Sequence, residues 1–275
     1  MTKKPERIIQ SSNEGYTDRT STRISNEIPS KHNPYITEHV RYYGYDLFEL
    51  MQKRSYVDVL FLLFHGELPS KHQARLFEAL HIALINLGPR HPATRAAMNA
   101  GVGKTKPAHI LPIGLSVSGG AWLGGIEVSE SMQWLKSIKK EDARGLANTL
   151  LETNSPKREG DWHIAPGFGS RFGDIDLIPQ KLIKKLIELP GSRDILSWAS
   201  EFSLELNKHK LGCLITGVTA AALLDLGFHP RAGAGLFQLM SAPGLLAHGL
   251  ELSNKPRTAM PFLNDEQYIM ETEND

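Results

Sequence analysis

The ten-residue segment IAPGFGSRFG, residues 164–173, holds the groups in this chain that are best suited to binding a ligand. Gly167 and Gly169 allow positive φ and let a ligand approach the backbone closely. Successive backbone N–H groups in such a turn can form an anion-binding nest for a phosphate or an adenine edge. Arg171 places a fixed positive charge beside it. The segment therefore predicts a loop that contacts an anionic, nucleotide-like ligand.

Other motifs resemble catalytic signatures without meeting their requirements. Residues 101–105, Gly-Val-Gly-Lys-Thr, resemble the end of a P-loop, but Met98 stands at the position of its first glycine and no predicted strand precedes it. The eleven histidines include no His-Glu-x-x-His motif, so no metal site is predicted. Four of them lie in apolar helical contexts typical of core or interface residues: His65, His81, His109 and His248.

Composition limits the function classes. The 275 residues carry 31 basic and 30 acidic side chains, which gives no electrostatic reason to expect nucleic acid or an anionic membrane as partner. One cysteine, Cys213, excludes an internal disulfide and fits a reducing compartment, so we expect a cytoplasmic protein. No secretory signal or membrane span is predicted. Acidic residues near the start argue against a transit peptide, the alternative for residues 1–33, which we interpret as a flexible arm.

The hydrophobic pattern is helical along the chain and predicts an all-α fold. Ser55 and Asp58 predict a capped helix start, and Gly66 predicts its end at residue 65. Small residues in two of the predicted helices favour a close helix–helix interface. Residues 173–178 could form a short strand, but a loop fits them better. Further helices are predicted over residues 46–51, 71–87, 94–100, 108–123, 128–135, 140–153, 179–189, 192–207, 211–226 and 232–252.

Several blocks, in order, resemble the citrate synthase superfamily. Residues 41–50, RYYGYDLFEL, resemble its RGYDIEEL block, and residues 55–70, SYVDVLFLLFHGELPS, resemble SFEEVAYLLLYGELPT. Residues 118–121, SGGA, resemble HGGA, and residues 166–169 match PGFG. Residues 243–251, PGLLAHGLE, resemble AGWIAHWLE, and a Pro-Arg pair follows where the family has RP. The length is closest to citryl-CoA lyases and the lyase module of ATP-citrate lyase.

The resemblance, which runs from about residue 38 to 270, implies a two-domain helical fold with the active-site cleft between the domains. The large domain would comprise residues 34–118 and 236–275, and the small domain residues 119–235. It further implies a homodimer, an acyl-CoA thioester as substrate together with a small oxo-acid or hydroxy-acid, and no tightly bound cofactor. The residues that would contact coenzyme A are Pro166, Gly167, Phe168, Gly169 and Arg171.

The family's catalytic positions are altered here. Ser118 stands in place of the histidine of HGGA, Ser170 in place of the histidine after PGFG, and Cys213 near the position of the aspartate base. Arg257 persists, and Arg90 follows Gly88-Pro89, so these two arginines are the candidates for binding substrate carboxylates. The family's carboxylate-binding arginine and acceptor-binding histidine fall near Ser241 and Leu87. The altered positions indicate an acceptor less anionic than oxaloacetate.

A serine can donate to an oxyanion but cannot remove an α-proton unaided, so another side chain must be the base. His163, which precedes the PGFG block, is the foremost candidate, and a surface histidine beside Trp162 is the alternative interpretation. Other candidates are Asp174, Asp176 and His209.

Two hypotheses follow. The first is an enzyme of citrate synthase or citryl-CoA lyase type, an acyltransferase or lyase that makes or cleaves a carbon–carbon bond alpha to a CoA thioester. The second is a non-catalytic CoA-binding protein or the heteromeric partner of an active paralogue. The first draws on the scaffold and the loop, and the second on the loss of several ionisable groups.

Overall fold

The computed structural model describes residues 19–154, 162–261, 263–264 and 266–269. The chain divides into two compact units, residues 1–67 and 68–275. Eleven α-helices and two small sheets occur in the described part, so the all-α class is confirmed. None of these helices combines the length and apolar character needed to cross a bilayer. The division into a large and a small domain, with residues 1–33 as an arm, stays a prediction.

The first unit contains a three-stranded antiparallel sheet and two helices. Strand β1 falls in the stretch expected to be a flexible arm, of which residues 1–18 lie outside the described residues. The sheet joins strands that are neighbours in sequence, but their polar, non-alternating residues gave no strand signal. The elements are β1 (Ser25–Pro29), β2 (Thr37–Tyr42), β3 (Tyr45–Asp46), α1 (Leu47–Lys53) and α2 (Tyr56–His65).

Local capping fixes the helix ends in this unit. The Asp46 carboxylate accepts hydrogen bonds from two backbone N–H groups at the start of α1. Ser55 and Asp58 form the predicted capping box of α2, and Gly66 ends that helix in the left-handed conformation at φ 86°. The capping box and the Gly66 helix end were predicted from the sequence because each acts over about four residues, whereas Asp46 was expected inside its helix.

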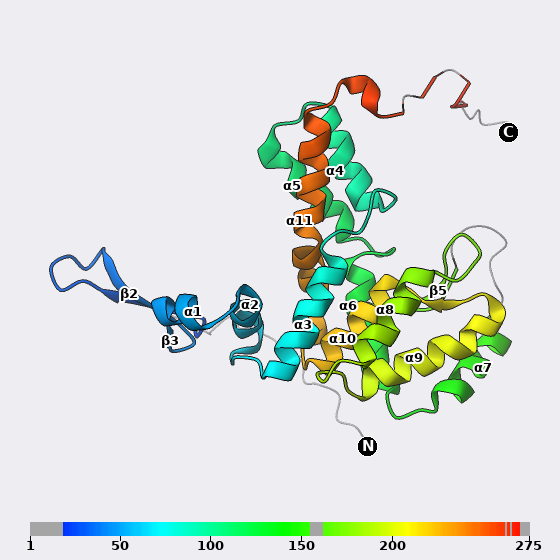
Figure 1. The fold of residues 1–275 in the computed structure, drawn as a ribbon, viewed down its shortest axis with the longest axis horizontal. Helices are drawn as coiled ribbons and strands as arrows, with labels where there is room; N and C mark the ends of the chain where they lie inside the picture. The colour runs from blue at the N-terminus through cyan, green and yellow to red at the C-terminus, as the bar shows by residue number, and fades with distance from the viewer. Residues whose placement is uncertain (1–18, 155–161, 262, 265, 270–275) are drawn as a thin grey trace, which may run out of the picture. The chain divides into compact units, whose positions relative to one another are not determined.

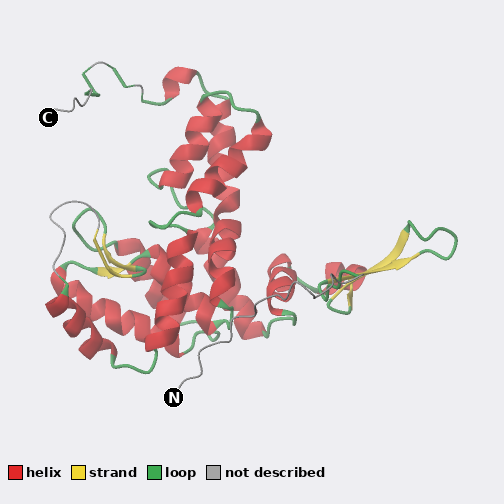
Figure 2. Ribbon diagram, turned by 180° about the vertical axis from the view of Figure 1, so that it is seen from behind, coloured by secondary structure: helices red, strands yellow, loops and turns green. Residues whose placement is uncertain are grey.

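The second unit holds the remaining elements (Figure 1). The helices are α3 (Lys71–Leu84), α4 (Pro92–Val102), α5 (Pro107–Ser118), α6 (Gly125–Ile138), α7 (Ala143–Thr153), α8 (Leu177–Ile187), α9 (Asp194–Leu206), α10 (Ile215–Asp225) and α11 (Gly233–Ser253). Three 3₁₀ turns cover Asn207–His209, Pro230–Ala232 and Arg257–Ala259. Strands β4 (Trp162–Ala165), β5 (Phe168–Ser170) and β6 (Gly212–Cys213) form an antiparallel sheet in the order β4-β5-β6 (Figure 2).

Helices α4, α5 and α11 pack side by side (Figure 1). Small residues make this approach close: a Cβ added at Gly101 would stand 2.0 Å from the Gly249 carbonyl oxygen. A buried cluster of Ala93, Ala97, Ala100, Ile110 and Leu245 fills the interface. The helix–helix interface predicted from small residues is therefore confirmed.

The strands of the second sheet were missed in the sequence. Residues 211–226 were expected to form one helix, but Gly212 and Cys213 pair with Gly169 and Phe168 before α10 begins. This pairing joins residues more than forty positions apart, which local periodicity does not register. Phe168 is fully buried and packs against Trp134 of α6 and Phe202 of α9, which ties the sheet to the helices.

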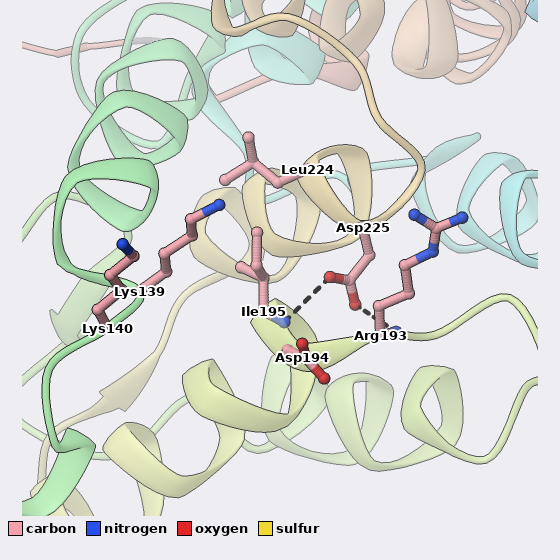
Figure 3. Close-up of a pocket in the computed structure, with 7 residues that line it drawn as sticks. All are labelled: Lys139, Lys140, Arg193, Asp194, Ile195, Leu224 and Asp225. Atoms are coloured by element: carbon pink, nitrogen blue, oxygen red, sulfur yellow. Dashed lines mark hydrogen bonds between the residues drawn. The ribbon is translucent and has the colours of Figure 1, made fainter.

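At the start of α9, a buried carboxylate replaces an ordinary helix cap. Asp225 accepts hydrogen bonds from the backbone N–H groups of Arg193 at 2.7 Å, Ile195 at 3.0 Å and Leu196 at 3.1 Å. Figure 3 shows this carboxylate between the Arg193 and Ile195 nitrogens, in a hollow of about 360 Å³ that Lys139 and Lys140 also line. Burial raises the pKa of Asp225, and the three N–H donors oppose part of that rise.

We expect Asp225→Ala to lower the free energy of unfolding by about 2–4 kcal/mol, because the N–H groups at the start of α9 lose their acceptor. Urea unfolding followed by circular dichroism measures the change. Asp194→Ala is the matched control, since the Asp194 side chain is exposed in the same hollow. A loss no greater than that of the control would contradict the capping role.

Candidate functional site

The PGFG turn joins β4 to β5 and packs on α10. Gly167 has φ 79°, and a Cβ added there would stand 2.5 Å from the Gly217 Cα. A side chain at Gly217 would in turn meet the Gly167 carbonyl oxygen at 2.2 Å. Both glycines are therefore required for the contact between the turn and α10.

The polar groups of Gly167 are engaged within the protein. Its N–H donates to Glu127 Oε1 at 3.1 Å, and its carbonyl oxygen accepts from the Leu214 N–H at 2.9 Å. The predicted anion nest thus has one of its amides already directed at an internal carboxylate. Phe168 is a core residue here, so Arg171 is the side chain of this segment that lines a cavity.

Glu127, in the first turn of α6, organises the polar groups around this turn. Its side chain is 3% exposed. Oε2 accepts from the Leu123 N–H at 2.8 Å, while Oε1 lies 2.5 Å from His163 Nδ1 and also accepts from Gly167. These donors satisfy a buried carboxylate that would otherwise be costly. One side chain thereby fixes a loop, a turn and an imidazole.

His163 on β4 is held in one orientation. Its ring stacks on Trp122 with a centroid separation of 3.7 Å and an interplanar angle of 10°. Because Nδ1 donates to Glu127, this hydrogen bond assigns the neutral ring's lone pair to Nε2. Nε2 is buried and has no hydrogen-bond partner among the described residues. A buried imidazole backed by a carboxylate is an arrangement suited to accepting a proton.

A second histidine joins this network from the start of α4. His91 Nδ1 accepts from the Ala93 N–H at 3.2 Å, so Nε2 carries the proton and donates to the Leu123 carbonyl oxygen at 3.0 Å. Burial lowers the pKa of His91, and Arg171 lowers it further. Both ring nitrogens are thus occupied and the ring is neutral at neutral pH, which makes His91 a structural link to the Glu127 network.

Beside His91 lies a cavity of about 190 Å³. Arg171 enters it with Nε buried and unpartnered among the described residues. The guanidinium pairs with Asp176 at 3.8 Å and lies 5.2 Å from the centre of the Phe172 ring. The rest of the lining is Ala83, Asn86, Leu87, His91, Ile178, Pro179 and Ile215.

The structure separates the other predicted catalytic positions. Ser118 is buried at the end of α5 and its hydroxyl donates to the Leu115 carbonyl oxygen at 3.1 Å. Ser170 ends β5, paired with Trp162 and next to Arg171. Cys213 lies opposite Phe168 in the sheet, and its N–H donates to Ser203 Oγ at 2.8 Å. Ser170 therefore shares the β4–β5 hairpin with His163, whereas Ser118 is committed to its own helix.

Burial raises the pKa of the Cys213 thiol to about 11, so the thiol is protonated at neutral pH. Because the thiolate is the reactive form, we expect iodoacetamide to leave the folded protein unmodified at pH 8 and to alkylate it fully in guanidinium chloride. Mass spectrometry of the intact protein measures both. Rapid alkylation of the folded protein would contradict the buried, protonated state.

The substrate-binding arginines predicted from the sequence do not line the cavity. Arg90 is exposed in the turn before α4, and Arg257 is exposed in the 3₁₀ turn after α11. Among the alternative bases, Asp174 and His209 are also exposed. The P-loop-like motif has a structural role, because Lys104 Nζ donates to the Ser253 and Lys255 carbonyl oxygens at the end of α11.

The sequence interpretation missed Glu127 and Trp122. A usable signal was present: Glu127 lies on the buried face of α6 with Val128, Ser131 and Met132. An acidic residue at such a position is rarely buried unless it is paired, which marks it for attention. Trp122 gave no comparable signal, since its contact with His163 is between residues 41 positions apart.

Comparisons with known proteins identify a matching family model and solved structures with a similar fold. A family model described as the C-terminal domain of citrate synthase matches residues 17–122. The structure of citryl-CoA lyase from Hydrogenobacter thermophilus superposes with a TM-score of 0.73 at 24% identity, over 92% of this chain and 94% of that one. The chain has the citrate synthase fold. The family model and the shared fold agree with the resemblance to the citrate synthase superfamily that the sequence blocks indicated, although the PGFG block lies outside the matched residues.

Two further structures share the citrate synthase fold. ATP citrate lyase from Methanothrix soehngenii, in complex with citrate and coenzyme A, gives a TM-score of 0.68 at 18% identity. The Methanosaeta concilii ATP citrate lyase, a mutant in complex with (3S)-citryl-CoA, gives 0.69 at 18% identity. They cover 98% and 100% of this chain, which spans 48% and 47% of theirs. A search of curated protein sequences found no match.

Proposed function

We propose that this protein makes or cleaves a carbon–carbon bond alpha to the carbonyl of a CoA thioester, with a small oxo-acid as the second reactant. The observation that carries the proposal is the His163 imidazole, backed by Glu127 beside the PGFG turn. The fold shared with citryl-CoA lyase, and with ATP citrate lyase bound to citryl-CoA, supports the reaction class.

In this proposal His163 is the general base. Glu127 holds the ring through Nδ1 and stabilises the imidazolium that forms when Nε2 accepts a proton. Nε2 is covered in this structure, and Trp122, which is 50% exposed, stacks on the ring. Substrate access therefore requires a rearrangement that uncovers Nε2, whose lone pair lies in the ring plane, whereas Trp122 covers the ring face.

The steps balance as an aldol addition. Nε2 takes the α-proton of the acyl group, the C–H electron pair forms the enolate double bond, and the thioester π pair moves to oxygen. The enolate carbon then bonds to the ketone carbon of the oxo-acid, and the ketone π pair becomes an alkoxide. The proton on Nε2 returns to that alkoxide and gives a hydroxyacyl-CoA. Cleavage is the same sequence reversed.

Ser170 has no assigned role in these steps, because it pairs with Trp162 while His163 pairs with Gly169, which places the two side chains on opposite faces of the hairpin. Arg171 follows directly and supplies the cation of the adjacent cavity. Ser118 and Cys213 have no role in the proposed chemistry, because the hydroxyl of the first is engaged within α5 and the thiol of the second is protonated.

The test uses purified protein with acetyl-CoA and a panel of 2-oxo acids, and separately with citryl-CoA. Formation of hydroxyacyl-CoA in the first assay, and its cleavage in the second, are followed by mass spectrometry. We expect turnover with at least one pair of reactants. A folded protein that binds CoA and turns over none of them above the buffer rate would contradict the proposal.

The second candidate is a CoA-binding protein without turnover, alone or paired with an active paralogue. The observation that favours it is the state of Ser118 and Cys213, which stand at family catalytic positions without a free hydroxyl or an ionised group. Calorimetry with CoA, together with the turnover panel, separates the two candidates, because this one predicts affinity without product.

The homodimer, the paralogous partner and the cytoplasmic location implied by the sequence stay predictions. Light scattering of the purified protein tests the first of them.

A further inference from the structure

We infer that the cavity beside His91 binds a 2-oxo acid with one carboxylate and a short apolar side chain, anchored by Arg171. The inference rests on the proposed function and names the substrate class of its second reactant. It draws on the volume of the cavity, the charge of its lining and the groups already engaged there.

The volume sets the size of the ligand. The cavity measures about 190 Å³. An engineered protein cavity of about 150 Å³ binds benzene, whereas pockets for drug-sized ligands measure roughly 300–1,000 Å³. The space therefore suits a molecule of roughly six to eight non-hydrogen atoms. Coenzyme A is too large to lie wholly within it.

Arg171 supplies the binding group for a carboxylate. A guanidinium has five N–H donors in a planar fork, and it recognises carboxylates bidentately. The closest approach of its Nη1 to Asp176 is 3.8 Å, longer than a hydrogen bond. Donors therefore remain for one carboxylate of a ligand.

A second carboxylate would lack a counter-charge. Arg171 is the cationic side chain in the lining, and Asp176 already offsets its charge. His91 has both nitrogens engaged with the backbone. Asn86 Oδ1 accepts from the Gly88 N–H at 2.9 Å and lies 3.1 Å from His248 Nε2, so its NH₂ group is what it can offer a ligand. That neutral donor suits a ketone oxygen.

The remaining surface of the cavity is apolar. It is formed by the side chains of Ala83, Leu87, Ile178, Pro179 and Ile215. Burying a methyl or ethyl group against these residues is favourable, whereas burying a carboxylate there without a partner is strongly unfavourable. The side chain of the oxo-acid is therefore apolar and short.

Calorimetry of the whole protein tests this, with pyruvate, 2-oxobutanoate, oxaloacetate and 2-oxoglutarate as probes, each with and without CoA. We expect the two monocarboxylates to bind at least 10-fold more tightly than the two dicarboxylates. Equal or tighter binding of oxaloacetate overturns the inference. So does the absence of binding by all four acids at millimolar concentration.

Arg171→Gln should weaken binding of 2-oxobutanoate about 10- to 100-fold while CoA affinity stays unchanged, as expected for loss of a charge-assisted pair. Arg171→Lys keeps the charge and should recover part of that loss. Arg95→Gln, an exposed arginine on α4, is the matched control. Unchanged acid affinity in a folded Arg171→Gln protein overturns the assignment, and a parallel loss of CoA affinity moves Arg171 to the thioester site.

Asp176→Asn tests the charge balance in the opposite direction. Asparagine keeps the helix cap that Asp176 provides at Ile178 but removes the charge that offsets Arg171. In this variant, the ratio of the dissociation constants of the dicarboxylates to those of the monocarboxylates should fall by about 10-fold. An unchanged preference overturns the charge argument.

Failure of the inference and failure of the proposed function give different results. Turnover that prefers oxaloacetate leaves the proposed function intact and overturns the inference. Arg171-dependent binding of 2-oxobutanoate, without turnover of any reactant pair, supports the inference about the cavity and contradicts the proposed function.

Discussion

His163→Asn lowers kcat for the proposed reaction by about 10²–10⁴-fold, the range expected for the loss of a general base. The asparagine NH₂ group can take the place of Nδ1–H and donate to Glu127, so the network around the PGFG turn is kept. The lone pair of Nε2 has no counterpart in asparagine. The expected result is therefore a loss of kcat with little change in CoA affinity or in the midpoint of thermal unfolding.

Glu127→Gln extends this test to the group that positions the base. It lowers kcat and also destabilises the protein, because one carboxylate oxygen that accepts an N–H is replaced by an NH₂ group facing the same donor. Glu130→Gln, an exposed change on the same helix, is the control. If His163→Asn retained full kcat, His163 would be a structural residue and the base would lie elsewhere.

Gly167→Ala destabilises the protein by about 2–4 kcal/mol, because it combines a positive φ with overpacking. The added Cβ would stand 2.5 Å from the Gly217 Cα and 2.7 Å from Ser131 Oγ, so α10 or the turn must shift. That shift would also disturb the hydrogen bond from Gly167 to Glu127. The variant is therefore expected to lose activity even at temperatures where it remains folded.

Gly235→Ala is the matched control for this change. Gly235 lies in α11, and a Cβ there would have no heavy atom within 4 Å. We expect a neutral or slightly stabilising effect, since alanine is the better helix former. Urea unfolding measures the free energy of unfolding of both variants. A Gly167→Ala protein as stable as the control would show that the turn does not depend on its contact with α10.

Whether a structural feature could be predicted from the sequence depended on how far apart in the chain its interacting residues lie. The Ser55–Asp58 capping box and the Gly66 helix end were predicted because a few neighbouring residues determine them. The presence of α4 and α5 in a close helix–helix interface was predicted because small residues in a helix favour close packing. The β4-β5-β6 sheet was not, because Gly212 and Cys213 pair with a strand more than forty residues earlier.

In the candidate site, too, contacts between residues distant in the sequence were not predicted. His163 was identified because it lies beside a motif, but its partner Glu127 is 36 positions away and was not considered. The PGFG glycines were expected to face a ligand, whereas Gly167 contacts Gly217 and Glu127. Hydrophobic periodicity predicts the buried face of a helix, and a sequence motif predicts a turn. Neither predicts which helix face packs against which turn.

Transfer of the α-proton is the central claim, and it can be measured without knowing the second reactant. Acetyl-CoA is incubated with the protein in D₂O, with and without 2-oxobutanoate, and deuterium in the methyl group is followed by NMR and mass spectrometry. We predict incorporation above the buffer rate by the native protein, and incorporation at the buffer rate by His163→Asn. Calorimetrically confirmed binding of acetyl-CoA with no incorporation under either condition would contradict the account.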